Sequence, residues 1–101
     1  MKRVFIGHRG VGKSSLLHRH KEYFPGVPAF DLDIEIELRT GKKVADIFAN
    51  QGEPIFRELE HKVFQNIITL DNFVISVGGG FNPQFIPAEC EVIFAKCRII
   101  A

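Results

Sequence analysis

Eight residues near the amino terminus have the types and spacing that bind phosphate. Residues 7–14 read GHRGVGKS, which fits the pattern of glycine, any four residues, then Gly-Lys-Ser or Gly-Lys-Thr. Glycines let successive backbone N–H groups converge on an anion. Lys13 adds a positive charge, the Ser14 hydroxyl can ligate magnesium, and a helix beginning here points its unpaired N–H groups at the same anion. The pattern predicts a site for the phosphates of a nucleotide.

Two acids further along the chain could complete such a site. Asp31 and Asp33 stand two residues apart at the expected end of a strand, so both carboxylates would lie on one face of it. One could hold magnesium through water while the other meets a substrate hydroxyl. The alternative is that one acid caps a helix and the other is a solvated surface acid.

A triple glycine and an arginine are the remaining candidates for chemistry. Residues 78–80 are all glycine, which lets a ligand approach backbone N–H groups, although a plain turn would also explain them. Arg57 could hold a carboxylate by two parallel hydrogen bonds. It could instead form a surface pair with Glu60, three residues further on. The spacing alone does not decide between these two roles.

The elements that position these groups alternate between strands and helices. Apolar runs predict four strands, over residues 2–6, 29–33, 73–77 and 91–95. Helices are expected over residues 13–23, between Asp33 and Gly41, over 44–50 and 53–70, with a short helical turn at 83–87. The segment 34–39 alternates apolar and polar residues as a strand would, but Asp33 as an N-cap and Gly41 as a stop favour a helix there.

The long helix should bury one apolar stripe. Its members recur at spacings of three and four residues: Phe56, Leu59, Val63, Ile67 and Leu70. Strands that alternate with helices predict an α/β fold, in which a parallel sheet carries helices on both faces. Ligands of such sheets bind beyond the carboxyl ends of the strands, and the phosphate pattern, the acid pair and the triple glycine all follow strands.

Composition excludes several classes of protein. The 101 residues suit one domain, and the net charge of +1 offers no basic surface for nucleic acid. No apolar run approaches the roughly 18 residues of a membrane span, and the amino terminus leads directly into a strand without the features of a signal peptide. We therefore expect a cytoplasmic protein whose two cysteines, Cys90 and Cys97, are reduced and packed.

Taken together, these motifs resemble those of shikimate kinases. The matching pieces are GHRGVGKSS at 7–15, DLDIEIELRTGKKVADIFANQGEPIFRELE at 31–60 and VISVGGG at 74–80. Their order and spacing make the match more specific than the phosphate pattern alone. The resemblance implies a three-layer sheet of the P-loop NTPase type. It also implies an ATP-dependent phosphotransferase that moves the γ-phosphoryl of ATP to the 3-hydroxyl of shikimate, in the biosynthesis of aromatic amino acids.

The resemblance also implies a role for each candidate residue. The ATP phosphates would be held by Gly10, Val11, Gly12, Lys13, Ser14 and Ser15. Mg²⁺, the expected cofactor, would be ligated by Ser14 and supported by Asp31. Asp33 would bind the shikimate hydroxyls and act with Lys13 in catalysis, Arg57 would bind the substrate carboxylate, and Gly79 would contact substrate through its backbone.

The chain departs from the family pattern at its carboxyl end. Family members continue well past the position of Ala101, with a lid arginine, a second arginine for the carboxylate, an adenine-binding loop and a fifth strand. The resemblance therefore implies that residues 1–101 form a single kinase domain, truncated at its C-terminus after about four strands. Arg98 lies too near the fourth strand to replace the lid arginine. The expected partners are ATP and shikimate, with no nucleic acid and no membrane.

Two other functions stay open. A chain without the lid arginine could be a non-catalytic nucleotide-binding module, since that arginine supplies charge to the transition state. A related P-loop kinase such as a gluconate kinase is the third possibility, against which Asp33, Arg57 and Gly79 argue. We expect a monomer if the domain is complete, and self-association through the uncovered fourth strand if it is not.

Overall fold

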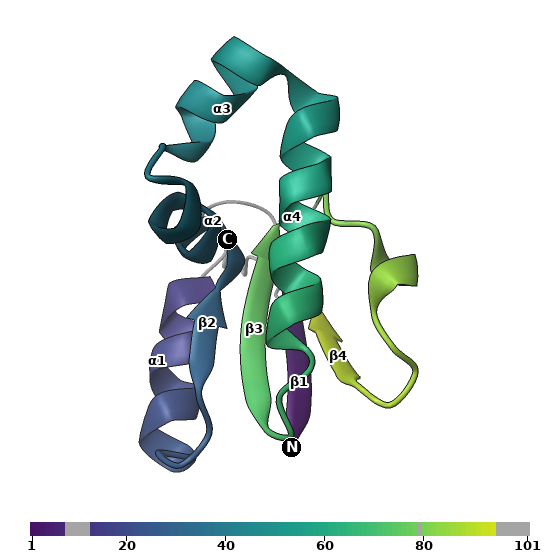
Figure 1. Cartoon of the computed structure of the whole chain (residues 1–101). Coiled ribbons are helices and arrows are strands. Elements are labelled where there is room, and N and C mark those ends of the chain that lie inside the picture. Colours follow the sequence, from purple (N-terminus) through teal and green to yellow (C-terminus); the bar gives the residue numbers. More distant parts are fainter. Residues whose placement is uncertain (8–12, 79, 95–101) are drawn as a thin grey trace, which may run out of the picture.

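Four parallel strands form the single sheet of the computed structural model, which describes residues 1–7, 13–78 and 80–94 (Figure 1). In sequence they are β1 (Lys2–Gly7), β2 (Ala29–Asp31), β3 (Phe73–Gly78) and β4 (Glu91–Phe94). Their order across the sheet is β2-β3-β1-β4, and every neighbouring pair is parallel. The four predicted strands are confirmed, although β2 ends at Asp31 rather than at residue 33.

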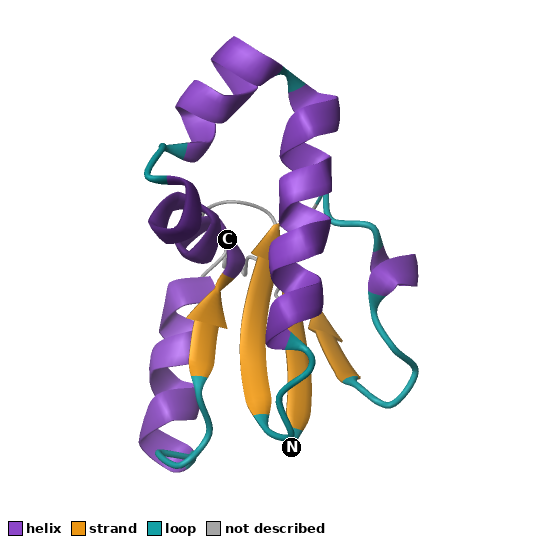
Figure 2. Ribbon diagram, viewed as in Figure 1, coloured by secondary structure: helices purple, strands orange, loops and turns teal. Residues whose placement is uncertain are grey.

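Along the chain, the segments that connect consecutive strands contain the helices (Figure 2). They are α1 (Lys13–Tyr23), α2 (Leu32–Thr40), α3 (Val44–Gln51) and α4 (Glu53–Ile67), with a 3₁₀ turn, η1, at Pro83–Phe85. The helix predicted before Gly41 is confirmed, because Gly41 ends α2 in the left-handed region at φ 69°. None of the helices in the described ranges is both long and apolar enough to cross a bilayer.

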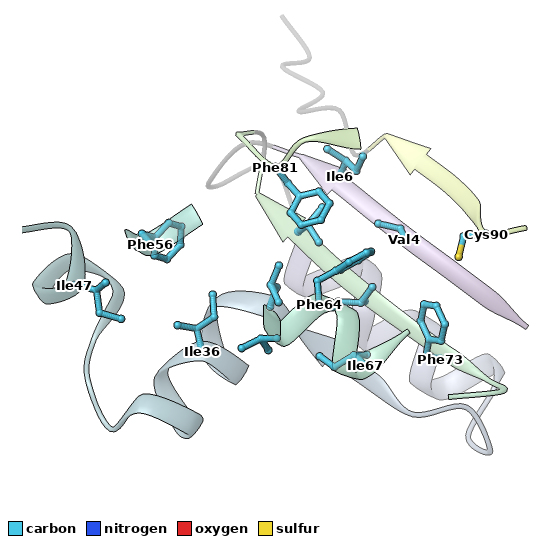
Figure 3. Packing of buried hydrophobic residues seen from close by; sticks show 14 residues of the cluster. Val4, Ile6, Ile36, Ile47, Phe56, Phe64, Ile67, Phe73, Phe81 and Cys90 are labelled. Carbon is cyan, nitrogen blue, oxygen red and sulfur yellow. The ribbon is translucent and has the colours of Figure 1, made fainter. Parts of the chain in front are cut away.

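Alternating side chains bury both faces of the sheet. Val4 and Ile6 of β1 belong to a cluster with α2, α3 and α4, whereas Phe5 between them packs with Leu17 of α1. Figure 3 shows Phe64 of α4 within the larger cluster, where its side chain is fully buried. The predicted arrangement of a parallel sheet with helices on both faces is confirmed.

The predicted end of the long helix is wrong by one turn. α4 ends at Ile67, and Leu70, expected in the buried stripe, is 40% exposed. The Thr69 hydroxyl donates to the Asn66 carbonyl at 2.7 Å, a local bond that competes with helical hydrogen bonding. The chain therefore turns after Ile67 and enters β3 at Phe73.

Cys90 has the environment of a packed, unreactive thiol. It is a free cysteine at 9% exposure within the larger cluster. Burial raises the pKa of this thiol, and the charge of Glu89 raises it further. A raised pKa keeps the thiol protonated, which agrees with the expectation for this residue. Cys97 lies outside the described residues.

His20 is buried where α1 meets the sheet. It is 5% exposed, with its ring centroid 6.0 Å from that of Phe5 and 4.9 Å from that of Phe24. Neither ring nitrogen has a hydrogen-bond partner within the described part of the chain. Burial lowers the pKa of His20, and the positive charge of Arg3 on β1 lowers it further. The folded protein therefore favours the neutral imidazole.

Acidification is expected to destabilise the fold through His20. In the unfolded chain this histidine has a pKa of about 6.5, so below that pH the unfolded state binds a proton that the folded state resists. The free energy of unfolding, measured in urea at about pH 8 and about pH 5.5, should fall at the lower pH. The His20→Phe variant should lose less stability over this interval than wild type. Equal pH dependence of wild type and His20→Phe would contradict this assignment.

Candidate active site

The carboxyl ends of three strands meet at one edge of the sheet. In the β1–β3 pair Gly7 lies opposite Gly78, and in the β2–β3 pair Asp31 lies opposite Ser76. Gly7 begins the phosphate pattern, Gly78 begins the triple glycine, and Asp31 is the first of the two acids. The sheet therefore brings these three motifs to a common edge, where ligands of parallel α/β proteins bind.

Much of the phosphate pattern itself lies outside the description. Gly10, Val11 and Gly12 are not among the described residues, and neither is Gly79. α1 begins at Lys13, directly after this segment, and continues through Ser14 and Ser15; the side chains of residues 13–16 are not described. The arrangement of strand, connecting segment and helix is the context that the phosphate pattern requires.

The acid pair is arranged differently from the prediction. Asp31, not Asp33, is the N-cap of α2: its Oδ1 accepts hydrogen bonds from the N–H groups of Asp33 at 3.0 Å and Ile34 at 3.4 Å. The chain becomes helical at Leu32, whose side chain is buried, so Asp33 lies in the first turn of α2 with an exposed side chain. The expectation that both carboxylates share one face of an extended strand is therefore wrong. Both acids still stand at the carboxyl edge of the sheet. There they lie at the N-terminus of α2, where negative charge interacts favourably with the helix dipole.

Oxygen atoms suited to magnesium gather at this edge. Ser76 is 1% exposed, and its hydroxyl has no hydrogen-bond partner among the described residues. It stands beside Asp31 in the register of β2 and β3. Hard oxygen ligands of this kind are what Mg²⁺ prefers. The described side chains contain no group of three His, Cys, Asp or Glu that could hold a metal.

Arg57 on α4 is held in place by a buried acid. Its Nη1 donates to both carboxylate oxygens of Glu60, at 3.0 and 3.2 Å, while the Glu60 side chain is only 5% exposed. The Arg57 side chain is 37% exposed and its guanidinium lies 5.4 Å from the centre of the Phe56 ring. The pair with Glu60 uses one nitrogen of the fork, and Glu53, at 3.7 Å from Nη2, is the only other acid that approaches it in the described chain. The alternative of a surface pair is thus half right: the pair exists, but one member is buried.

Glu60 holds a predicted site residue, Arg57, although the sequence suggested it only as a surface partner. It shares the buried side of α4 with Phe56, Val63, Phe64 and Ile67. Glu60 falls at the helical spacing of the apolar stripe, and this position is the sequence signal that could have identified it. A carboxylate buried there requires a partner. Arg57, which the sequence predicts as a carboxylate-binding residue, is a partner of Glu60.

The fold brings Arg57 to the triple glycine. A Cβ built on Gly80 would lie 2.6 Å from Arg57 Nη2, so the guanidinium rests directly on the backbone at this position. Gly80 follows β3 by two residues, and β3 ends beside Gly7. A cation from α4, the end of β3 and the start of the phosphate pattern therefore share one edge of the molecule.

A separate hollow lies on the outer side of β2. Its volume is about 310 Å³, and it lies between α1 and α2, where its lining includes His18, Lys21, Ile34 and Glu35. Of the predicted site residues that the structure describes, Asp31 lines this hollow. Since neither Arg57 nor Gly80 lines this hollow, it does not unite the predicted binding groups.

Comparison with known proteins gives one consistent result. The family model for shikimate kinase matches residues 9–99. A shikimate kinase from Rhodococcus jostii (strain RHA1) is 37% identical over 79 residues, covering 78% of this chain and 46% of that protein. One from Parabacteroides distasonis is 34% identical over 98% of this chain and 60% of that protein. The chain spans about half the length of the curated relatives it matches.

Solved structures agree in fold. The crystal structure of shikimate kinase from Aquifex aeolicus matches with a TM-score of 0.88 and 30% identity, over 98% of this chain and 61% of that one. Shikimate kinase from Acinetobacter baumannii, in complex with shikimate, matches with a TM-score of 0.83 and 27% identity, over 94% of this chain and 56% of that one. The matching parts therefore share one fold as well as related sequences.

Proposed function

Because the chain belongs to the shikimate kinase family, we propose that it carries the phosphate-binding and carboxylate-binding elements for transfer of the γ-phosphoryl of ATP to the 3-hydroxyl of shikimate. The observation that carries this proposal is the contact between the Arg57 guanidinium and Gly80, beside the strand end where the phosphate pattern begins. A carboxylate bound by Arg57 would then lie at the same sheet edge as the phosphates of the nucleotide.

On the nucleotide side, the phosphates are bound by the segment between β1 and α1. We assign this role to Gly10, Val11, Gly12, Lys13, Ser14 and Ser15. The support is the position of α1, which begins at Lys13 and so presents its unpaired N–H groups there. Ser14 and Asp31 are the proposed magnesium residues, with the Ser76 hydroxyl close enough in register to assist. When bound, the metal neutralises charge on the β- and γ-phosphates.

On the substrate side, Arg57 binds the carboxylate of shikimate. The guanidinium is partly exposed and oriented by Glu60, so its fork is already in place before substrate arrives. Asp33, exposed in the first turn of α2, accepts hydrogen bonds from substrate hydroxyls and takes the proton of the attacking 3-hydroxyl. Gly79 contributes its backbone N–H. Positioning and charge neutralisation account for most of the catalysis of phosphoryl transfer.

We also propose that residues 1–101 belong to a single kinase domain, because both hydrophobic clusters include side chains of the same sheet. Phe94 of β4, at the edge of that sheet, is 62% exposed. An exposed apolar edge strand is a place where we expect self-association.

A second candidate function is a nucleotide-binding module that does not transfer phosphate. The observation that favours it is coverage, since the chain spans only 46% of the Rhodococcus relative and 56–61% of the solved structures. The family resemblance implies a lid beyond the matched residues. Such a lid would exclude water and supply charge to the transition state, and a lid arginine is worth about 10³-fold or more in rate.

A coupled ADP-release assay separates these candidates. The kinase predicts ADP release that depends on shikimate, whereas the binding module predicts ATP binding without shikimate-dependent turnover. ADP release with gluconate in place of shikimate would instead indicate the related sugar-acid kinases. Absence of ATP binding would contradict both candidates.

Two variants of Asp31 separate its structural role from its proposed metal role. Asp31→Ala removes the N-cap of α2 and should lower the free energy of unfolding by about 1 kcal/mol. Asp31→Asn keeps an oxygen that can accept the same hydrogen bonds, so it should retain most of that stability. Both variants should require more Mg²⁺ for half-maximal ATP binding, because both lose the carboxylate charge. An unchanged Mg²⁺ requirement in Asp31→Asn would remove Asp31 from the proposed metal site.

A further inference from the structure

Gly80 touches Arg57 more closely than any side chain would permit. A Cβ at this position would lie 2.6 Å from Nη2, 3.2 Å from Cζ and 3.4 Å from Nη1 of Arg57. Its backbone does not require glycine, since Gly41 and Gly52 are the glycines with positive φ among the described residues. The nearest atoms to the missing Cβ all belong to the guanidinium. The requirement for glycine here is therefore contact with Arg57 and not backbone conformation.

Both partners of this contact are attached to the same helix. Phe81, the residue after Gly80, is 3% exposed and packs on Phe64 of α4 with ring centroids 4.7 Å apart. Phe85, further along the same segment, stacks on His61 of α4 at 4.0 Å. The segment that carries Gly80 is thus fixed to α4 at two points, and it cannot easily move away from Arg57.

The guanidinium is also restrained, but less strongly. Nη1 bonds to the buried Glu60, and the group lies beside the ring of Phe56. It is nevertheless the far end of a flexible side chain, so an added methyl group at residue 80 would displace it without breaking the core. A substitution at Gly80 should therefore change where the positive charge stands while leaving the protein folded.

We propose that Gly80 is a positioning residue that determines where Arg57 presents its fork to the substrate carboxylate. This inference rests on the proposed function, in which Arg57 binds the carboxylate of shikimate. Absence of a side chain at residue 80 lets the guanidinium stand against the end of β3. Any larger residue displaces the guanidinium from this position, because its Cβ would lie 2.6 Å from Nη2.

Titration calorimetry of four proteins tests the proposal: wild type, Gly80→Ala, Arg57→Lys and the double variant. Gly80→Ala should raise the Kd for shikimate by about 10-fold or more, since a misplacement of about 1 Å can cost 10²-fold, and it should leave the Kd for ATP unchanged. Lysine has no Nη2, so adding Gly80→Ala to Arg57→Lys should change the Kd by less than about twofold. Gly26→Ala is the matched control, because nothing lies within 4 Å of the Cβ added there.

A measurement without ligand keeps this inference separate from the proposed function. The Nε–Hε resonance of Arg57 in NMR spectra should shift in Gly80→Ala and stay in place in Gly26→Ala. If the wild-type chain binds no shikimate, the proposed function fails, while this resonance still decides whether Gly80 positions Arg57. An unshifted resonance in Gly80→Ala, or equal losses of shikimate affinity in the Arg57 and Arg57→Lys backgrounds, would overturn the inference.

Discussion

Replacing Arg57 by alanine is expected to weaken shikimate binding by about 10- to 100-fold while leaving ATP affinity nearly unchanged. A hydrogen bond to a charged group contributes about 1.5–3 kcal/mol, and each 1.4 kcal/mol corresponds to about tenfold in Kd. The substrate carboxylate would lose its cation, whereas the proposed phosphate-binding segment follows β1 and does not include Arg57. Titration calorimetry with shikimate, and separately with ATP and Mg²⁺, measures both affinities.

Arg57→Lys is the informative companion of this variant. Lysine keeps a positive charge near the buried Glu60 but cannot offer two parallel N–H groups to a carboxylate. It should therefore fold as wild type and still bind shikimate more weakly. Arg57→Ala removes a partner of Glu60 as well, so its free energy of unfolding should be measured alongside. Loss of both ligands in a folded Arg57→Ala protein would contradict the assignment of Arg57 to the substrate carboxylate.

Replacing Lys13 by alanine should have the opposite selectivity. ATP affinity is expected to fall by about 10- to 100-fold, because the phosphates lose a charged donor, while the Kd for shikimate stays nearly the same. Lys21→Ala is the matched control: it removes the same charge from the same helix, α1, near its other end. Calorimetry with ATP and Mg²⁺ provides the comparison. If Lys13→Ala and Lys21→Ala bind ATP equally well, Lys13 has no part in phosphate binding.

Local patterns were sufficient to predict most of the elements. The segment 34–39 alternates like a strand, yet the stop at Gly41 correctly indicated a helix, because the left-handed backbone there suits glycine. The cap at the other end was misplaced. Asp31 and Asp33 are both good caps by type, and the burial of Leu32, which decides where the helix begins, depends on contacts with distant residues.

Contacts between distant segments account for what the sequence could not show. A spacing of three residues on one helix is enough to predict the pair of Arg57 and Glu60. The burial of Glu60 depends on packing across the core, and the contact of Arg57 with Gly80 joins α4 to the segment after β3. No sequence pattern in either segment predicts the contact between Arg57 and Gly80. The triple glycine by itself therefore predicts a backbone donor site, and it gives no sign of the contact that its third member makes with Arg57.

The carboxylate-binding end of the proposed site is built largely by α4. This helix provides Arg57, the Glu60 that orients it, and the rings that hold the segment after β3. Because these contacts hold Arg57 in place before substrate binds, less conformational entropy is lost on binding. Shikimate affinity should therefore depend on α4 more than on the phosphate segment.

One titration tests the central claim most directly. In NMR spectra of the 101-residue chain, added shikimate should shift the Arg57 Nε–Hε resonance, and ATP with Mg²⁺ should shift the backbone amides at the start of α1. Both sets of shifts in one sample would show that one protein binds shikimate at Arg57 and nucleotide phosphates at the start of α1. Shikimate-induced shifts that leave Arg57 untouched and gather elsewhere would contradict the account.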